Sequence, residues 1–113
     1  MESQNTNSIS VCIATYNGER FIREQIDSIL NQLRENDEIV IVDDCSIDKT
    51  RDIIVSYSNP KIKLFRNPIN LGCNKTFERA ISLSSNEIIF LSDQDDIWDP
   101  NKVKIVLSCF QNK

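Results

Sequence analysis

The sequence contains no histidine, and this absence removes a large class of chemistry. Without an imidazole, neither a Ser-His nor a Cys-His pair can generate a nucleophile. Glycine is scarce as well: Gly18 and Gly72 are the only two, so neither a P-loop nor a dinucleotide-binding fingerprint is present. The cysteines are scattered and form no C-x-x-C pair, which favours free thiols in a reducing compartment over a zinc site.

Long apolar runs and basic clusters are also missing. The longest apolar runs, at 39–42 and 88–91, have the length of strands, whereas a membrane-spanning helix needs about 20 apolar residues. The net charge of −4, without a basic cluster, argues against nucleic acid as a partner. The polar segment 1–8 has no apolar signal region and is expected to be a disordered lead-in to one domain at 9–113. We therefore expect a cytoplasmic protein.

What the sequence does contain is a regular alternation of strand-like and helix-like segments. Four short runs rich in β-branched residues are predicted to be strands, at 9–14, 38–42, 62–65 and 87–91. Helical spacing of apolar residues lies between them, over 19–33 and 76–83, and Asp48 and Asp99-Pro100 are suited to begin two further helices. This alternation predicts an α/β fold with three layers, α/β/α, and a mainly parallel sheet in the order 3-2-1-4.

Polar residues gather where three of the predicted strands end. They are Thr15-Tyr16-Asn17, Asp43-Asp44, and Asp93-Gln94-Asp95-Asp96. Ligands of parallel sheets bind beyond the carboxyl ends of the strands. We therefore expect these three groups to form one ligand site.

The acidic run after the last predicted strand suits a divalent metal ion. Asp93 and Asp95 offer hard oxygen ligands, which Mg²⁺ and Mn²⁺ prefer and often share with substrate phosphates. The alternative is a solvated acidic turn that caps a helix, and it would be favoured for an isolated D-x-D. The position of the motif directly after a buried strand favours the metal site instead.

Two interpretations remain open for Asp43 and Asp44. One carboxylate could accept a hydrogen bond from the N3–H of a uracil ring. The pair could equally form a local turn with Ser46, because aspartate side chains commonly bond to backbone amides two or three residues further on.

Four segments, in order, resemble the family 2 glycosyltransferases. They are Val11–Glu19, Val42–Thr50, Asn67–Gly72 and Asp93–Trp98. The resemblance spans residues 8–106, which is nearly the whole chain. The form Asp-Gln-Asp-Asp-Ile-Trp resembles the bacterial branch that builds surface polysaccharides, which includes rhamnosyltransferases and transferases of other sugars.

The resemblance implies a GT-A fold with a Rossmann-like nucleotide-binding half, a nucleoside-diphosphate-sugar donor, Mn²⁺ or Mg²⁺, and inversion at the anomeric carbon. A UDP-sugar is favoured and a dTDP-sugar is the alternative donor. The acceptor of the full-length enzyme would be a saccharide or a lipid-linked saccharide. For that enzyme, the resemblance is compatible with a peripheral position at the inner face of the membrane.

The site residues are carried over position by position. The donor-binding positions that the resemblance implies are Ala14, Thr15, Tyr16, Glu19, Asp44, Lys75, Asp93 and Gln94. Asp44 would contact the base, and Lys75 would lie near the diphosphate. Asp93 would face the ribose or the metal, and Asp95 would ligate the metal.

The chain departs from the family pattern in two respects. Thr76 stands where the family has asparagine, which weakens the assignment of Lys75. The family's general base lies beyond Lys113, so the chain is expected to be a fragment that lacks the acceptor site and is inactive alone. The strand at 87–91 would then present an open apolar edge, which could pair with a second copy as a homodimer.

Two other classes compete with this interpretation. A receiver-type signalling module also has a parallel sheet and an acidic pair, but its pair follows the first strand, whereas Asp43-Asp44 follows the second. A nucleotidyltransferase would need a basic, glycine-rich loop after the first strand, and Thr15–Glu19 does not supply one. For the aromatic residues, Trp98 is expected to pack under the acidic turn, and Phe21, Phe77 and Phe90 are expected in the core.

Overall fold

The structure of the protein is a computed structural model that describes residues 8–111; the lead-in predicted at 1–8 lies outside them, apart from Ser8. Strands and helices alternate strictly along the chain. In order, they are β1 (Ile9–Thr15), α1 (Ile22–Leu30), β2 (Glu38–Asp43), α2 (Thr50–Ser56), β3 (Ile62–Arg66), α3 (Cys73–Ser82), β4 (Ile88–Ser92) and α4 (Lys102–Gln111).

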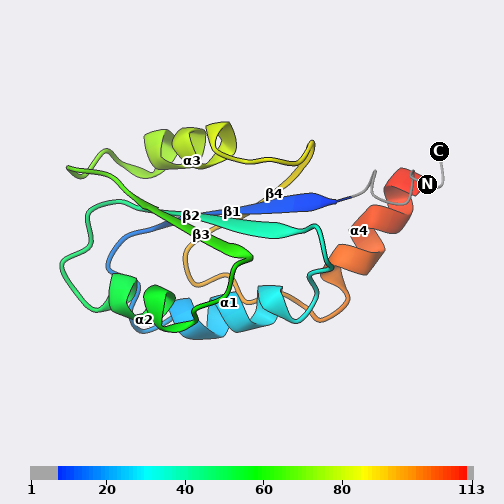
Figure 1. The fold of residues 1–113 in the computed structure, drawn as a ribbon, viewed down its shortest axis with the longest axis horizontal. Coiled ribbons are helices and arrows are strands. Elements are labelled where there is room, and N and C mark those ends of the chain that lie inside the picture. Colours follow the sequence, from blue (N-terminus) through cyan, green and yellow to red (C-terminus); the bar gives the residue numbers. More distant parts are fainter. Residues whose placement is uncertain (1–7, 112–113) are drawn as a thin grey trace.

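The four strands form one sheet in the order β3-β2-β1-β4, and every pair is parallel. This confirms the predicted α/β class, the parallel sheet and the strand order. Helix α3 covers one face of the sheet, whereas α1 and α2 lie on the other, with α4 beyond the end of α1 (Figure 1). Within residues 8–111 no helix is both long and apolar enough to span a bilayer.

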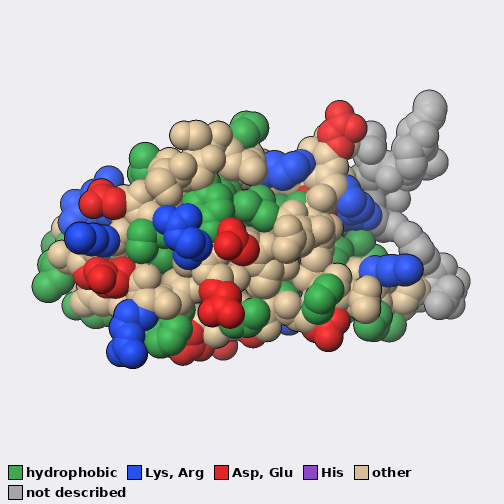
Figure 2. Space-filling view, turned by 90° about the horizontal axis from the view of Figure 1, so that it is seen from below, with side chains coloured by type: hydrophobic (Ala, Val, Ile, Leu, Met, Phe, Trp, Pro, Cys, Tyr) green, Lys and Arg blue, Asp and Glu red, His purple; other side chains and the backbone are tan. Residues whose placement is uncertain are grey.

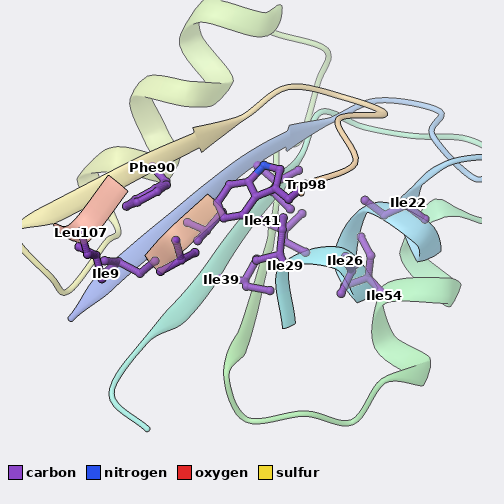
Figure 3. Packing of buried hydrophobic residues seen from close by; sticks show 13 residues of the cluster. Ile9, Ile22, Ile26, Ile29, Ile39, Ile41, Ile54, Phe90, Trp98 and Leu107 are labelled. Carbon is purple, nitrogen blue, oxygen red and sulfur yellow. The ribbon is translucent and has the colours of Figure 1, made fainter. Parts of the chain in front are cut away.

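Both faces of the sheet are buried, because helices pack on each of them. Residues of β1 and β2 that point to one face pack with α1, α2 and α4, and Figure 3 shows this cluster with Trp98, Ile29 and Ile41 near its centre. Alternate residues of the same strands point to the other face, where Cys12, Val40 and Val42 pack with Ala80 of α3. Two buried faces explain why these strands are continuous apolar runs.

Three aromatic predictions are confirmed, including that of Phe90 in the larger apolar cluster, and one is wrong. Trp98 is buried and lies against Phe90, with ring centroids 5.5 Å apart, as expected of a packing residue. Phe77 packs against the smaller cluster. Phe21 was expected in the core but is 38% exposed, because α1 begins one residue after it and Phe21 belongs to the preceding turn.

The predicted helix starts also need correction. Helix α1 begins at Ile22, since residues 19–21 form a turn after the strand. Asp48 does not occupy the cap position of α2, which is Lys49, although its carboxylate accepts the Thr50 N–H at 2.9 Å. Asp99 similarly bonds to the Asn101 N–H at 2.8 Å, and α4 begins only at Lys102.

The face of the molecule that α1 and α2 cover carries charges of both signs. Figure 2 shows Lys and Arg interspersed with Asp and Glu there, with apolar side chains scattered between them. Charge mixed in this way offers no single-sign field to a polyanion over the face that is drawn.

The packing generates a stability prediction for β2. Ile41 is fully buried in the larger cluster, so Ile41→Val should lower the free energy of unfolding by about 0.5–1.5 kcal/mol. Ile47 is 87% exposed, so the same change there should alter it by less than about 0.5 kcal/mol. Urea denaturation of both variants measures the difference, and equal effects would contradict the placement of β2 in the core.

Candidate functional site

A pocket of about 370 Å³ lies beyond the carboxyl ends of β1 and β2. Its walls come from the end of β1, the residue after β2, the start of α3 and the turn after β4. The lining residues are Ala14, Thr15, Tyr16, Asp44, Asn70, Gly72, Cys73, Thr76 and Gln94. The parallel sheet therefore brings together residues of all three predicted polar groups or their neighbours, as expected for an open α/β sheet.

Asp44 is the buried charge of this pocket and is only 5% exposed. Its Oδ1 accepts the Leu71 N–H at 2.7 Å and the Asn67 side-chain amide at 2.9 Å, and its Oδ2 accepts the Gly72 N–H at 2.9 Å. Burial alone would raise the pKa of Asp44, but these hydrogen bonds outweigh burial and hold the pKa below its usual value. The carboxylate is thus ionised and serves as a fixed acceptor in the wall.

The loop before α3 is shaped around Asp44. Asn67 is fully buried, and its side-chain amide also donates to Thr76 Oγ1 at 3.0 Å. Thr76 Oγ1 in turn donates to the Gly72 carbonyl at 2.7 Å. Gly72 has a φ of 95°, a conformation that a side chain disfavours, and this directs its N–H at the carboxylate.

A second set of hydrogen bonds ties the loop after β1 to the loop after β2. Asn17 N–H donates to Ser46 Oγ at 2.8 Å, and its side-chain oxygen accepts the Ile47 N–H at 3.0 Å. Gly18 N–H donates to Thr50 Oγ1 at 2.8 Å, and a Cβ at Gly18 would lie 2.9 Å from Thr15 Oγ1. Two segments distant in the sequence therefore hold each other in one conformation.

Glu19 belongs to this bracing and not to the pocket lining. Its carboxylate accepts the Lys49 N–H at 2.9 Å, and its own N–H donates to Asp48 Oδ2 at 3.2 Å. Its role in donor binding stays a prediction.

The structure places Asp43 in the local turn and Asp44 in the wall of the pocket. Asp43 is fully buried and closes the turn, because its carboxylate accepts both the N–H and the Oγ–H of Ser46. Asp44 lines the pocket. Consecutive residues point to opposite sides of a strand, so only one of the pair can reach the cavity.

The acidic run after β4 forms a tight turn beside the pocket. The Asp96 N–H donates to the Asp93 carbonyl at 3.1 Å, and Asp95 has a φ of 60°. Gln94 lines the pocket, and its Oε1 accepts the Tyr16 N–H at 2.9 Å. Asp93 and Asp95 are exposed and lie outside the lining.

The chemistry of this turn fits a divalent cation shared with a ligand. Two exposed carboxylates supply hard oxygen atoms, as Mg²⁺ and Mn²⁺ require. Among residues 8–111 no group of three or more acidic, cysteine or histidine side chains could hold a metal ion. The part of the chain that the structure describes thus offers too few ligands for a closed metal cage, and the roles of Asp93 and Asp95 as ligands stay predictions.

Lys75 lies on the first turn of α3, is exposed, and is not part of the pocket lining. Sequence reasoning missed five residues that build the pocket, namely Asn67, Asn70, Gly72, Cys73 and Thr76. The segment 67–72 enters the sequence argument only as part of the resemblance. The signal that could have identified it is the glycine before α3 among polar residues, because such a glycine allows the backbone to turn its N–H groups toward a partner.

The environment of Asp44 generates a prediction about pH. Because its folded pKa is lowered, its ionised form contributes stability above the ordinary pKa, and this contribution is lost as pH falls through the folded value. Asp44→Asn should lower the free energy of unfolding at pH 7 by about 1–3 kcal/mol, since an amide cannot accept all three hydrogen bonds.

The deficit of Asp44→Asn should shrink as the pH falls below about 4, because the unfolded chain then takes up a proton that the folded Asp44 carboxylate still resists. Urea denaturation from pH 3 to 7 measures it, with Asp52→Asn on the exposed face of α2 as the matched control. A deficit independent of pH would contradict the assignment.

Comparisons with known proteins agree with this geometry. The sequence model of the family described as Glycosyl transferase family 2 matches residues 10–113. A UDP-Glc:alpha-D-GlcNAc-diphosphoundecaprenol beta-1,3-glucosyltransferase of Escherichia coli, WfgD, is 34% identical over 88% of the chain and 40% of its own length. The dTDP-rhamnosyl transferase RfbG of Shigella flexneri is 39% identical over 86% of the chain and 36% of its own length.

Solved structures share the fold. S. aureus TarS 1-349 in complex with UDP-GlcNAc superposes with a TM-score of 0.86 at 29% identity, over 93% of this chain and 31% of that one. The mannosyltransferase PcManGT from Pyrobaculum calidifontis, in complex with GDP-Man and Mn²⁺, has a TM-score of 0.77 at 25% identity, over 84% and 30% of the two chains. The chain spans 33% and 40% of the length of two of its relatives. With the family's sequence model matched from residue 10 to residue 113, the chain belongs to glycosyl transferase family 2.

Proposed function

We propose that this chain forms the donor-binding part of a glycosyltransferase and holds a nucleoside-diphosphate sugar in the pocket beside Asp44. The observation that carries the proposal is the buried, ionised Asp44 in a concave site at the carboxyl edge of the sheet. A pyrimidine ring carries an N3–H donor, and Asp44 supplies a fixed acceptor. Its existing hydrogen bonds hold it in place without occupying every lone pair, because a carboxylate has about four.

The remaining walls suit the base and the ribose. Ala14 and Tyr16 offer apolar surface, and Thr15 Oγ1 is a buried hydroxyl without a partner among residues 8–111. Gln94 is fixed by the Tyr16 N–H through its oxygen, so its NH₂ group is left to donate to a ligand. A UDP-sugar is the favoured donor, in line with UDP-GlcNAc in TarS, and a dTDP-sugar is the alternative, in line with the name of RfbG.

We place the diphosphate next to Asp93 and Asp95, together with Mn²⁺ or Mg²⁺. When bound, such an ion neutralises the charge that develops on the leaving nucleotide. Asp93 also lies toward the ribose in this arrangement, and Lys75 on α3 adds a positive charge near the phosphates. The support for a divalent ion comes from the two exposed carboxylates and from Mn²⁺ in PcManGT.

The second half of the proposed reaction is the activation of the acceptor hydroxyl. Transfer with inversion needs a carboxylate that deprotonates the acceptor hydroxyl, and none of the described acids faces the pocket in that role. We propose that this base lies beyond Lys113 and that residues 1–113 alone do not transfer sugar. The acceptor would be a saccharide or lipid-linked saccharide of bacterial surface polysaccharide synthesis, at the cytoplasmic face of the membrane.

Calorimetry tests the donor site directly. UDP should bind in the presence of Mn²⁺, and Asp44→Ala and Asp95→Ala should each weaken binding by at least about tenfold, a loss of roughly 1.4 kcal/mol. Asp52→Ala on α2 is the matched control and should leave the affinity unchanged. Binding that persists unchanged in EDTA would remove the metal role of Asp95, and rapid sugar transfer by residues 1–113 would place the base within the chain.

We also propose self-association through the open edge of the sheet. Among residues 8–111 no strand pairs with the outer side of β4. Leu91 on β4 is 52% exposed, and Ile97 and Ile105, which line one hollow formed by the segment after β4, are 45% and 59% exposed. Such an edge is a template for pairing with a second copy, most simply in a two-fold dimer.

Sedimentation velocity at micromolar concentration measures this association. The wild type should sediment as a dimer, and Leu91→Lys should shift it toward the monomer, because a lysine on an edge strand opposes pairing. Ile47→Lys, at an exposed position of the loop after β2, is the control and should leave the dimer intact. A monomeric wild type that binds no apolar dye would show that the edge is closed.

A further inference from the structure

Helix α1 and the turn after it present a row of polar side chains to the segment that follows β4. Gln25 and Ser28 lie on α1 and Gln32 lies in the following turn, and their spacing of three and four residues places them on one side. Their partners are backbone groups of residues 93–103, taken in the same order along the chain. Each of these three side chains thus fixes a different part of the segment that carries the acidic turn.

Gln25 lies beneath the acidic turn. It is fully buried, and its Nε2 donates to Ser92 Oγ at 2.8 Å and to the Asp93 carbonyl at 2.7 Å. The same carbonyl accepts the Asp96 N–H that closes the turn. One amide group therefore holds the last residue of β4 and the carbonyl on which the turn is built.

Ser28 and Gln32 hold later parts of the same segment. Ser28 Oγ accepts the Trp98 N–H at 3.0 Å, which secures the residue that packs below the turn. Gln32 donates to the Asp99 carbonyl at 2.7 Å and accepts the Val103 N–H at 2.9 Å, which secures the start of α4. Gln32 is thus a residue of the same type, on the same side of the helix, with no contact to the turn.

Stability alone gives a weak reason for glutamine at position 25. The other buried positions of α1 are Ile22, Ile26 and Ile29, and they pack in the larger apolar cluster. Gln25 Oε1 has no hydrogen-bond partner among residues 8–111, and an unsatisfied buried polar atom is destabilising. A branched apolar side chain would avoid that penalty but could not donate to the Asp93 carbonyl.

We propose that Gln25 is a positioning residue of the donor site, which holds the Asp93–Asp96 turn in the conformation that presents Asp93 and Asp95 to a divalent cation. The turn needs such support because Asp95 adopts a positive φ of 60° and three aspartates lie within four residues. Left-handed backbone is unfavourable at a residue other than glycine, and like charges repel. Gln25 supplies the compensating anchor from below, and Gln94 holds the turn to Tyr16 from the side of the pocket.

The proposal rests on the proposed function and predicts a specific pattern of binding. Gln25→Leu removes the anchor, so the affinity of the protein–UDP complex for Mn²⁺ should fall by at least about tenfold. The affinity for UDP measured without metal, in EDTA, should change by less than about threefold, because Asp44 and its loop are untouched. Free Mn²⁺ counted by electron paramagnetic resonance gives the first quantity, and calorimetry gives the second.

Gln32→Leu is the matched control, since it removes the hydrogen bonds of the Gln32 side chain to Asp99 and Val103 of the same segment without touching the acidic turn. Its Mn²⁺ affinity should stay within about threefold of the wild type. Equal Mn²⁺ affinities in Gln25→Leu and Gln32→Leu would overturn the positioning role. A wild type that binds no UDP at all would instead overturn the proposed function, so the two failures are distinguishable.

Ser92→Ala extends the test if Gln25→Leu does not fold. It removes one of the two acceptors of the Gln25 amide and keeps the apolar packing of α1. The expected result is a loss of Mn²⁺ affinity of about twofold to fivefold, while the affinity for UDP measured in EDTA stays unchanged. Unchanged Mn²⁺ affinity in this variant would also overturn the proposal.

Discussion

The parallel pairing of four strands whose central pair is buried on both faces is the constraint on which the rest of this protein depends. Parallel strands must all return through helices, so every strand ends at the same edge of the sheet. The loops after β1, β2 and β4 are therefore neighbours in space although they are distant in the sequence. The central strands β1 and β2 contribute no exposed residue, which leaves the chain only these loops for chemistry.

The loops at that edge are held by polar contacts instead of apolar packing. Four residues there, Asn17, Cys45, Gly72 and Asp95, have a positive φ. Strain of this kind persists only where surrounding contacts determine the conformation, and it concentrates at ligand sites. Here those contacts are made by short polar side chains, with Asp44 and Ser46 as two of the acceptors.

The two edges of the sheet differ in a way that bears on the longer relatives. β3 is an edge strand whose two exposed residues, Lys63 and Arg66, are basic, which discourages further pairing. β4 has no such protection and ends directly in the acidic turn. Since the relatives are about two to three times longer than the region that matches this chain, β4 is the natural side for additional structure or for a second copy.

The sequence by itself determined the succession of elements, the parallel sheet and its order, because periodicity and strand-ending polar groups are local signals. It also indicated the acidic turn and the pair at 43–44. It could not decide which of Asp43 and Asp44 faces the cavity, nor that Phe21 remains half exposed, because both depend on where the backbone turns after a strand. Only the tertiary structure assembled Asn67, Gly72 and Thr76 around Asp44 and set Gln25 beneath Asp93. The reason is that these contacts join residues nine or more positions apart, with at least one complete element or loop between them.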